Sequence, residues 1–334
     1  MTFKPLTAMD MPRFAGIATF FRLPYVTAFD GLDIGVLGIP FDGGQFSQIS
    51  GARFGPRAVR TASARVRAYN PSLKVNPYET YTVADCGDVR VNPLDLEAAR
   101  RDITAGVKRL VDAGVIPMCV GGDHSISLPI LRAIAARHKP VGMIHFDAHS
   151  DTAYDDLGVA YGHGTPFRRA MEEGLLDPAR TIQIGLRGSM EGPEELDNAR
   201  AEGIEIITLD EVMDNGLKWV ASRFERLRGA PIYVSLDMDV LDPAFAPATG
   251  PNPGGLAARE LIYLVRRLAN QTVVGADVVE IDAPYDSPAG ATCVLAAQLM
   301  YEVMCAMSVD RGAAQRPSRE VPTMSIAPDP APPA

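Results

Sequence analysis

Eight short apolar runs, separated by segments with helical spacing, constrain this chain more than any other feature. Most runs are continuously apolar, which is typical of strands that are buried on both faces of a parallel sheet. The predicted strands span residues 34–39, 81–84, 116–120, 141–146, 181–184, 204–208, 232–236 and 273–279. Because helical segments alternate with them, we expect a three-layer α/β/α fold around a mostly parallel sheet of about eight strands.

The predicted helices cover residues 93–113, 128–137, 194–201, 257–268 and 292–307. The most apolar long window, 291–309, contains Gln298 and Glu302 and therefore indicates a buried helix and not a membrane span. No Pro/Ser-rich linker or block of charge interrupts residues 31–312, so we expect one domain there. Residues 1–30 are aromatic and basic, which suits docking on the domain or on another subunit. The Pro-rich tail, 313–334, is expected to be flexible.

Composition excludes several functional classes. The net charge of −9 argues against a nucleic-acid footprint and leaves room for a cationic small molecule. The N-terminus lacks a basic patch followed by an apolar core, so no signal peptide is expected. The four cysteines are scattered and favour reduced thiols. We therefore expect a cytoplasmic protein that binds neither nucleic acid nor a membrane.

Histidines and aspartates gather directly after three of the apolar runs. Alternate side chains of a strand share a face, so Asp147, His149 and Asp151 can lie together, as can Asp237 and Asp239. Carboxylates packed this closely repel each other, and a cation would relieve the repulsion. Ligands of parallel sheets bind at this edge. These residues and His124 therefore indicate a two-metal hydrolytic site.

The oxygen-rich ligand set favours particular metals. Four carboxylates and two imidazoles suit Mn²⁺ first, with Ni²⁺, Co²⁺ and Fe²⁺ as alternatives, better than a structural zinc site rich in cysteine. Two such ions share a water, lower its pKa and hold it ready as hydroxide. His145 is in phase with Asp147 along the strand, so we expect it to support a ligand, whereas Asp123 is expected to tie its loop to the backbone.

The residues of the motifs, and the order in which they occur, resemble one family. Gly-Gly-Asp-His-Ser at 121–125, Phe-Asp-Ala-His-Ser-Asp at 146–151 and Ser-Leu-Asp-Met-Asp-Val-Leu-Asp-Pro at 235–243 are similar to the ureohydrolase (arginase/agmatinase) family, in its agmatinase/guanidinobutyrase-like branch. The resemblance extends over residues 11–307. Further matching stretches are 50–57, 163–167, 183–187 and 279–281.

The resemblance implies a role for each motif residue. One ion would be held by His124, Asp147, Asp151 and Asp237, and the other by Asp147, His149, Asp237 and Asp239, so that Asp147 and Asp237 bridge. Asp151 would accept a proton when the metal-activated water attacks the guanidinium carbon. Glu280 would pair with the substrate guanidinium, and His163 would shuttle protons or contact substrate. The resemblance also implies a homotrimer or homohexamer.

The substrate is less constrained than the reaction. The loop at 152–161 carries two acids, two aromatics and no Lys or Arg, and Asp282 adds a negative charge close to Glu280. We therefore expect Tyr154, Asp155 and Asp282 to contact a cationic guanidine, either agmatine-like or a compact alkylguanidine or biguanide. The segment at 242–255 departs from the family pattern by one missing residue and by Ala248.

Two alternatives stay open at this level. The first is a guanidinobutyrase-type enzyme that hydrolyses a guanidino acid, because the stretches at 11–19 and 163–169 resemble guanidino-acid members as well. The second is a non-catalytic subunit that supports an active paralogue in a hetero-oligomer. Against the second, all six predicted ligands are present together with His163 and Glu280, which an inactive subunit has no chemical reason to keep.

Overall fold

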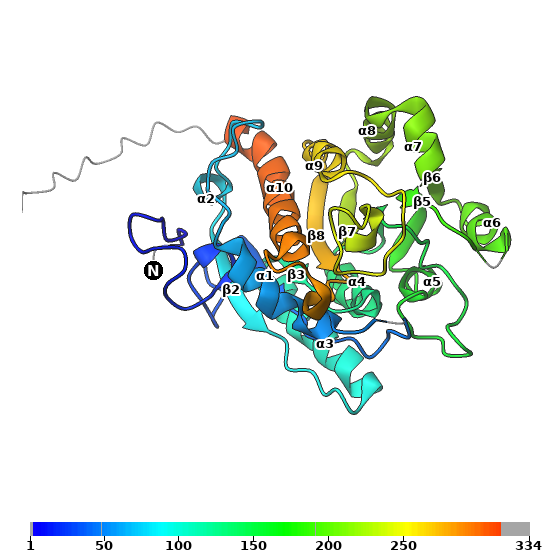
Figure 1. Ribbon diagram of the computed structural model, residues 1–334, viewed down its shortest axis with the longest axis horizontal. Helices are drawn as coiled ribbons and strands as arrows, with labels where there is room; N and C mark the ends of the chain where they lie inside the picture. Colours follow the sequence, from blue (N-terminus) through cyan, green and yellow to red (C-terminus); the bar gives the residue numbers. More distant parts are fainter. Residues whose placement is uncertain (1–2, 48, 191, 315–334) are drawn as a thin grey trace, which may run out of the picture.

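One sheet of eight strands organises the chain, and the pairing in it is parallel throughout (Figure 1). The computed structural model describes residues 3–47, 49–190 and 192–314. The strand order is β2-β1-β3-β8-β7-β4-β5-β6. The strands are β1 Ile34–Gly38, β2 Val83–Asp88, β3 Ile116–Val120, β4 Val141–Phe146, β5 Leu176–Leu186, β6 Glu205–Thr208, β7 Pro231–Asp237 and β8 Thr272–Val279.

Helices cover both faces of the sheet, as expected for parallel strands joined by crossovers. The longer helices are α1 Gly55–Ser63, α3 Leu96–Asp112, α4 Ser127–His138, α6 Glu194–Ala201, α9 Ala258–Arg266 and α10 Ala291–Ala314. The short ones are α2 Pro77–Thr80, α5 Pro166–Glu172, α7 Leu209–Asn215 and α8 Leu217–Arg223. Contacts join α10 to α1, α2, α9 and β8, and join α4 to α3, α5 and β8.

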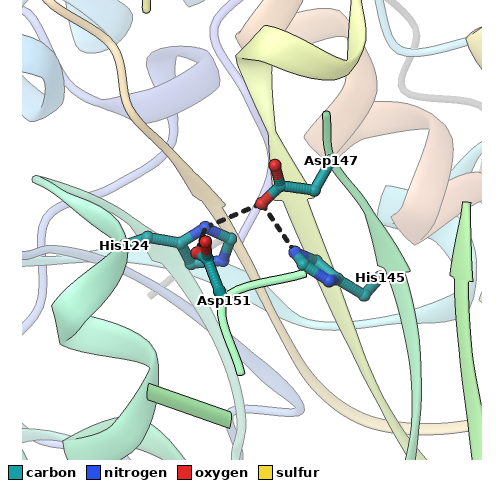
Figure 2. Close-up of side chains that lie close together, drawn as sticks. All are labelled: His124, His145, Asp147 and Asp151. Carbon is teal, nitrogen blue, oxygen red and sulfur yellow. Dashed lines mark hydrogen bonds and ion pairs between the residues drawn. The ribbon is translucent and has the colours of Figure 1, made fainter. Parts of the chain in front are cut away.

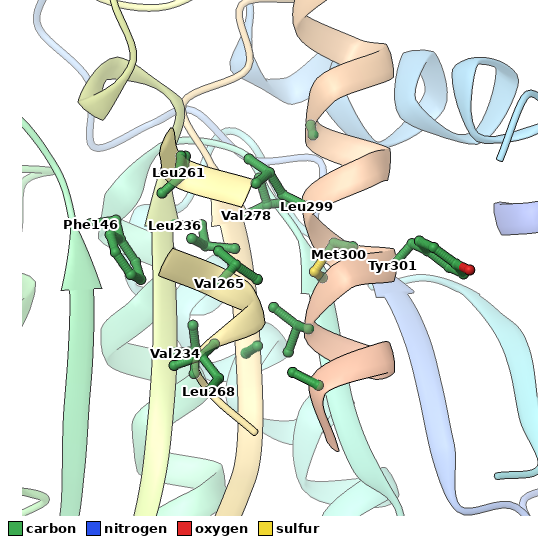
Figure 3. Packing of buried hydrophobic residues seen from close by; sticks show 14 of the residues in the cluster. Phe146, Val234, Leu236, Leu261, Val265, Leu268, Val278, Leu299, Met300 and Tyr301 are labelled. Carbon is green, nitrogen blue, oxygen red and sulfur yellow. The ribbon is translucent and has the colours of Figure 1, made fainter. Parts of the chain in front are cut away.

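Two apolar clusters fill the space between the sheet and the helices on its two faces. The first packs α9 and α10 onto the central strands and includes Phe146, Val234 and Val278 of the sheet with Leu299 and Met300 of α10 (Figure 3). The second lies between the other face and α3, α4 and α5, and includes Ile103, Ile134 and Phe167. The three-layer prediction is therefore confirmed, and the sheet is parallel in every pair and not merely in most.

The differences from the expected elements have local causes. β3 and β4 match the apolar runs, whereas β5 begins at Leu176, ahead of its run. The register with β4 shifts between Val141 and Met143, which accommodates the partly exposed residues 177–180 before the apolar run begins at Thr181. The five helices α1, α2, α5, α7 and α8 were not expected. The helices α2, α5, α7 and α8 have only four to seven residues, which is too short to show a helical repeat of apolar residues. The nine-residue α1 contains a single large apolar side chain apart from proline, that of Val59.

The apolar helix α10 lies within the core. Over Ala291–Val309 it is long and apolar enough to cross a membrane, but 83% of that window is buried inside the fold. The buried acid Glu302 of this helix accepts hydrogen bonds from Arg266 Nε at 2.8 Å, Asn70 Nδ2 at 2.7 Å and Gln298 Nε2 at 3.0 Å. Glu302 thereby ties α10 to α9 and to the loop after α1.

The segment before β1 packs partly on the domain. Phe20 and Phe21 are buried, and their backbone N–H groups donate to Asp85 and to Ser63, at 2.8 Å each. In contrast, the side chains of Met9, Phe14 and Ile17 are more than nine-tenths exposed. The predicted tail lies outside the described residues from 315 onward, and α10 ends at Ala314.

We expect Glu302→Ala to lower the free energy of unfolding by about 3 kcal/mol, because it leaves a buried amide and a partly buried guanidinium without their acceptor. Chemical denaturation measures the change. The control is Glu225→Ala, which removes an exposed pair with Arg228 and should change stability by less than about 0.5 kcal/mol. Equal effects of the two variants would show that the buried network contributes nothing specific.

Candidate metal centre and active site

The predicted ligands lie at one edge of the sheet because four adjacent strands end there. His124 begins the short helix η3 (His124–Ile126) after β3, and Asp147 follows β4. Asp237 is the last residue of β7, and Glu280 follows β8. In the order β3-β8-β7-β4 these strands are neighbours, so residues more than a hundred positions apart meet at their carboxyl ends.

The first cluster surrounds one imidazole nitrogen. His124 Nδ1 lies 3.1 Å from Asp147 Oδ2, 2.8 Å from Asp151 Oδ2 and 3.0 Å from Asp237 Oδ2. Figure 2 shows His124, Asp147 and Asp151 pointing toward one another, with His145 against Asp147. The side chains of His124, Asp147, Asp151 and Asp237 are all buried.

The second cluster lies beside the first and shares Asp147. His149 Nδ1 is 2.9 Å from Asp239 Oδ2 and 3.3 Å from Asp147 Oδ1, so the two oxygens of Asp147 face two different histidines. Asp237 Oδ1 accepts the backbone N–H of Asp239 at 2.8 Å, which joins the two clusters on their other side. All six predicted ligands are therefore brought together, with Asp147 between the two groups.

The donor set fits divalent cations. His124 Nδ1 is fully buried and has no hydrogen-bond partner among the described residues, although three carboxylates surround it. Burial raises the pKa of Asp237, and the charges of Asp239 and Asp147 raise it further. Burial and Asp147 likewise raise the pKa of Asp239. Cations between these groups would remove the repulsion among the carboxylates and would give His124 Nδ1 the partner that it lacks.

Buried polar residues orient the ligand side chains from behind. His145 Nε2 lies 2.8 Å from Asp147 Oδ2, as expected for a supporting residue, and its Nδ1 is 3.1 Å from Gln183 Nε2. His124 Nε2 lies 2.9 Å from Ser235 Oγ, which donates to Asp277 at 2.7 Å. These contacts hold both imidazole planes in place before any ion binds.

Glu280 and His163 form a second group beside the ligands. Glu280 Oε1 accepts the backbone N–H of His124 at 2.8 Å and lies 3.2 Å from His163 Nδ1. Burial lowers the pKa of His163, but the hydrogen bond and charge of Glu280 outweigh burial and raise that pKa to about 9. Glu280 and Asp151 adopt left-handed backbone conformations, with φ of 56° and 51°. Such strain in non-glycine residues is characteristic of functional sites.

A cavity of about 830 Å³ opens onto this group. Its wall includes the ligands His149, Asp151, Asp237 and Asp239 together with His163 and Glu280. Tyr154 also lines it, and the buried guanidinium of Arg168 stacks on the Tyr154 ring, 4.3 Å from the ring centroid. One wall of the cavity is therefore formed by an aromatic ring that a buried guanidinium holds in place.

Two residues expected to contact substrate lie elsewhere. Asp155 does not line the cavity, because its Oδ1 turns back to accept the N–H of Gly158 at 2.7 Å. Asp156 lines the cavity instead and accepts the N–H of Gly164. Asp282 is fully buried behind Glu280, where it faces Gln45. Neither Asp155 nor Asp282 therefore lines the cavity in which they were expected.

Other cavity residues were missed from the sequence. Asn252 Nδ2 lies 3.0 Å from His149 Nε2, and Gln45 Nε2 lies 3.1 Å from Glu280 Oε2. Both residues lie in Gly-rich loops, where an amide side chain does not by itself indicate a catalytic or binding role. The one clue in the sequence is that the loop carrying Gln45 follows the first strand, at the edge of the sheet where the ligands gather. Ala248, the departure from the family pattern, is buried and does not line the cavity, whereas its loop neighbours 250–252 do.

Comparison with known proteins identifies the fold and the reaction. The Arginase family model matches residues 32–306. The chain is 47% identical to guanidinopropionase of Pseudomonas aeruginosa, over 91% of this chain and 96% of that protein. It is 40% identical to mitochondrial agmatinase of Gallus gallus, over 91% and 89%. The solved structure of proclavaminate amidinohydrolase from Streptomyces clavuligerus superposes with a TM-score of 0.85 at 39% identity, covering 90% and 99%.

The family match spans the sheet and every predicted ligand, and the structure brings those ligands together at the sheet edge. Arginase-family enzymes depend on two metal ions, which agrees with the paired His/Asp clusters. The chain belongs to the arginase family and is a hydrolase of guanidino C–N bonds.

Proposed function

We propose that this enzyme hydrolyses a guanidine compound that carries no carboxylate, such as agmatine, a compact alkylguanidine or a biguanide. The observation that supports this proposal is the charge of the cavity wall. Among the described lining residues there is no Lys or Arg, whereas Asp156, Glu194 and Glu195 add negative charge beyond the metal ligands. A cationic tail is attracted by such a wall, and a substrate carboxylate is repelled.

We further propose the metal ligands. His124, Asp147, Asp151 and Asp237 would hold one ion, and Asp147, His149, Asp237 and Asp239 the other, with Mn²⁺ as the first choice and Ni²⁺ as the alternative. The distances around His124 Nδ1 and His149 Nδ1 support this division. Two ions bound there would supply a nucleophilic hydroxide at neutral pH.

The chain's own side chains would then divide the remaining work. Glu280, buried and ionisable, would pair with the substrate guanidinium. Asp151 lies on the cavity wall and would accept a proton from the attacking water. His163 lines the same wall, contacts Glu280 and has a raised pKa, so it would carry a proton to the leaving amine.

A second candidate substrate class is a guanidino acid. It is favoured by the 47% identity to a protein named guanidinopropionase. A guanidino acid requires neutral or positive groups for its carboxylate, and the described wall offers Tyr154, Asn198 and Asn252 as neutral donors. The balance of charge in the wall favours the cation, and a direct comparison of substrates decides between them.

We expect purified enzyme to release urea or a substituted urea faster from agmatine, methylguanidine or a biguanide than from guanidinobutyrate or guanidinopropionate at equal concentration. A double variant, Glu194→Gln with Glu195→Gln, should lower kcat/KM for cationic substrates by roughly two- to fivefold, because exposed charges interact weakly in water. Asp155→Asn is the matched control, since Asp155 is acidic but lies off the wall. Turnover of guanidino acids alone would exclude the cation preference.

We expect elemental analysis to find about two divalent ions per subunit, because the two histidine clusters each offer a complete set of ligands. His149→Ala should lower this to about one and abolish most activity, whereas His138→Ala, at the end of α4, should change neither. Removal of the ions by a chelator should lower the Tm, since the buried carboxylates then repel. A wild-type chain holding fewer than about one ion would instead support the non-catalytic subunit.

We also propose that the enzyme assembles as a homotrimer or homohexamer. Met9, Phe14 and Ile17, nearly fully exposed in a segment that is otherwise anchored through Phe20, provide an apolar contact surface of this kind. Phe14→Ser with Ile17→Ser should lower the mass measured by light scattering. The control is Leu157→Ser, which changes an exposed apolar residue on another loop. An unchanged mass would remove the segment from the interface.

A further inference from the structure

The hydrogen bonds of Glu280 leave it too few acceptor sites to hold a guanidinium alone. An ionised carboxylate offers about four lone-pair directions, two on each oxygen. Oε1 already accepts the backbone N–H of His124 and faces His163 Nδ1 at 3.2 Å. Oε2 receives Gln45 Nε2 at 3.1 Å, so one direction on Oε2 is left. A guanidinium presents pairs of parallel N–H donors and needs a second acceptor.

Gln45 lines the same cavity, and its side chain carries such an acceptor. Its Nε2 faces two carboxylates, Glu280 at 3.1 Å and Asp282 at 3.4 Å, which fixes the amide with nitrogen toward them. Its Oε1 is buried and has no hydrogen-bond partner among the described residues. A buried carbonyl oxygen without a partner is costly, so a rotation of the side chain that turns this oxygen toward the cavity, where a substrate can donate to it, is favourable when the site is in use.

The loop around Gln45 holds this amide in place. Gly44 donates its N–H to Asp123 at 2.7 Å and accepts the N–H of His163 at 3.0 Å. Phe46 packs edge-on against the His163 ring, with centroids 4.9 Å apart. The loop is thus attached on both sides of Gln45 to the residues that surround Glu280.

We propose that Gln45 is a substrate-binding residue: its amide oxygen and the remaining lone pair of Glu280 Oε2 together receive two N–H groups of the substrate guanidinium. The inference rests on the proposed guanidine substrate and adds the residue that orients it. Gln45 thereby selects for a planar group with adjacent donors and against cations that lack N–H, since charge alone would not distinguish them.

Replacement of Gln45 by Met tests the proposal, because Met keeps the length of the side chain but neither donates nor accepts. We expect KM for a small guanidine substrate to rise about ten- to a hundredfold, the effect of one hydrogen bond to a charged group, with a smaller change in kcat. Gln298→Met is the matched control, since Gln298 also donates to a buried carboxylate but lies on α10, away from the cavity. It should change KM less than about twofold.

Binding measured by calorimetry separates this inference from the reaction itself. Metal-loaded Gln45→Met should bind methylguanidinium about tenfold or more weakly than wild type, and both should bind tetramethylammonium, which has no N–H, alike. Gln45→Ala provides a second variant in case the thioether distorts the wall. Wild-type affinity for methylguanidinium in both variants would overturn the role of Gln45. Absence of urea release by wild type with intact binding would overturn only the proposed function.

Discussion

The repulsion among buried carboxylates at one edge of the sheet is the constraint on which the rest of the structure depends. Asp147, Asp151, Asp237, Asp239 and Glu280 are all buried there. Such an arrangement is stable only when cations bind between the charges and when rigid elements hold the side chains in place. Four neighbouring parallel strands provide that rigidity, because their backbones are fixed by ladders on both sides.

Rigidity is carried from the strands to the ligand atoms by a layer of buried polar groups. Ser235 and Asp277 lie on β7 and β8 and fix His124, while His145 and Gln183 lie on β4 and β5 and fix Asp147. The left-handed backbone sets the direction of two carboxylates, that of Asp151 in the loop after β4 and that of Glu280 directly after β8. Strain of this kind persists because the surrounding sheet determines the local conformation.

Specificity depends on loops and not on the sheet. The cavity wall combines the metal-ligand edge with the loop that carries Gln45, the loop that carries Tyr154 and the first turn of α6. The ligand edge determines that a guanidinium carbon is attacked. We propose that the acidic side chains of the wall, with the acceptor pair of Glu280 and Gln45, select the guanidine that reaches that position.

The sequence by itself determined the layer architecture and the ligand set. Continuous apolar runs predicted the buried parallel strands, since burial on both faces removes the need for alternation. The positions of His124, Asp147 and Asp237 at the ends of three runs predicted the ligand set. Tertiary structure decided what spacing cannot express: which strands are neighbours, that Asp156 and not Asp155 reaches the wall, and that Asp282 lies behind Glu280. The physical reason is that alternation along a strand is a local property, whereas the direction of a loop depends on contacts between distant segments. Gln45 is the example, because its position is fixed by a hydrogen bond to Glu280, 235 residues away in the chain.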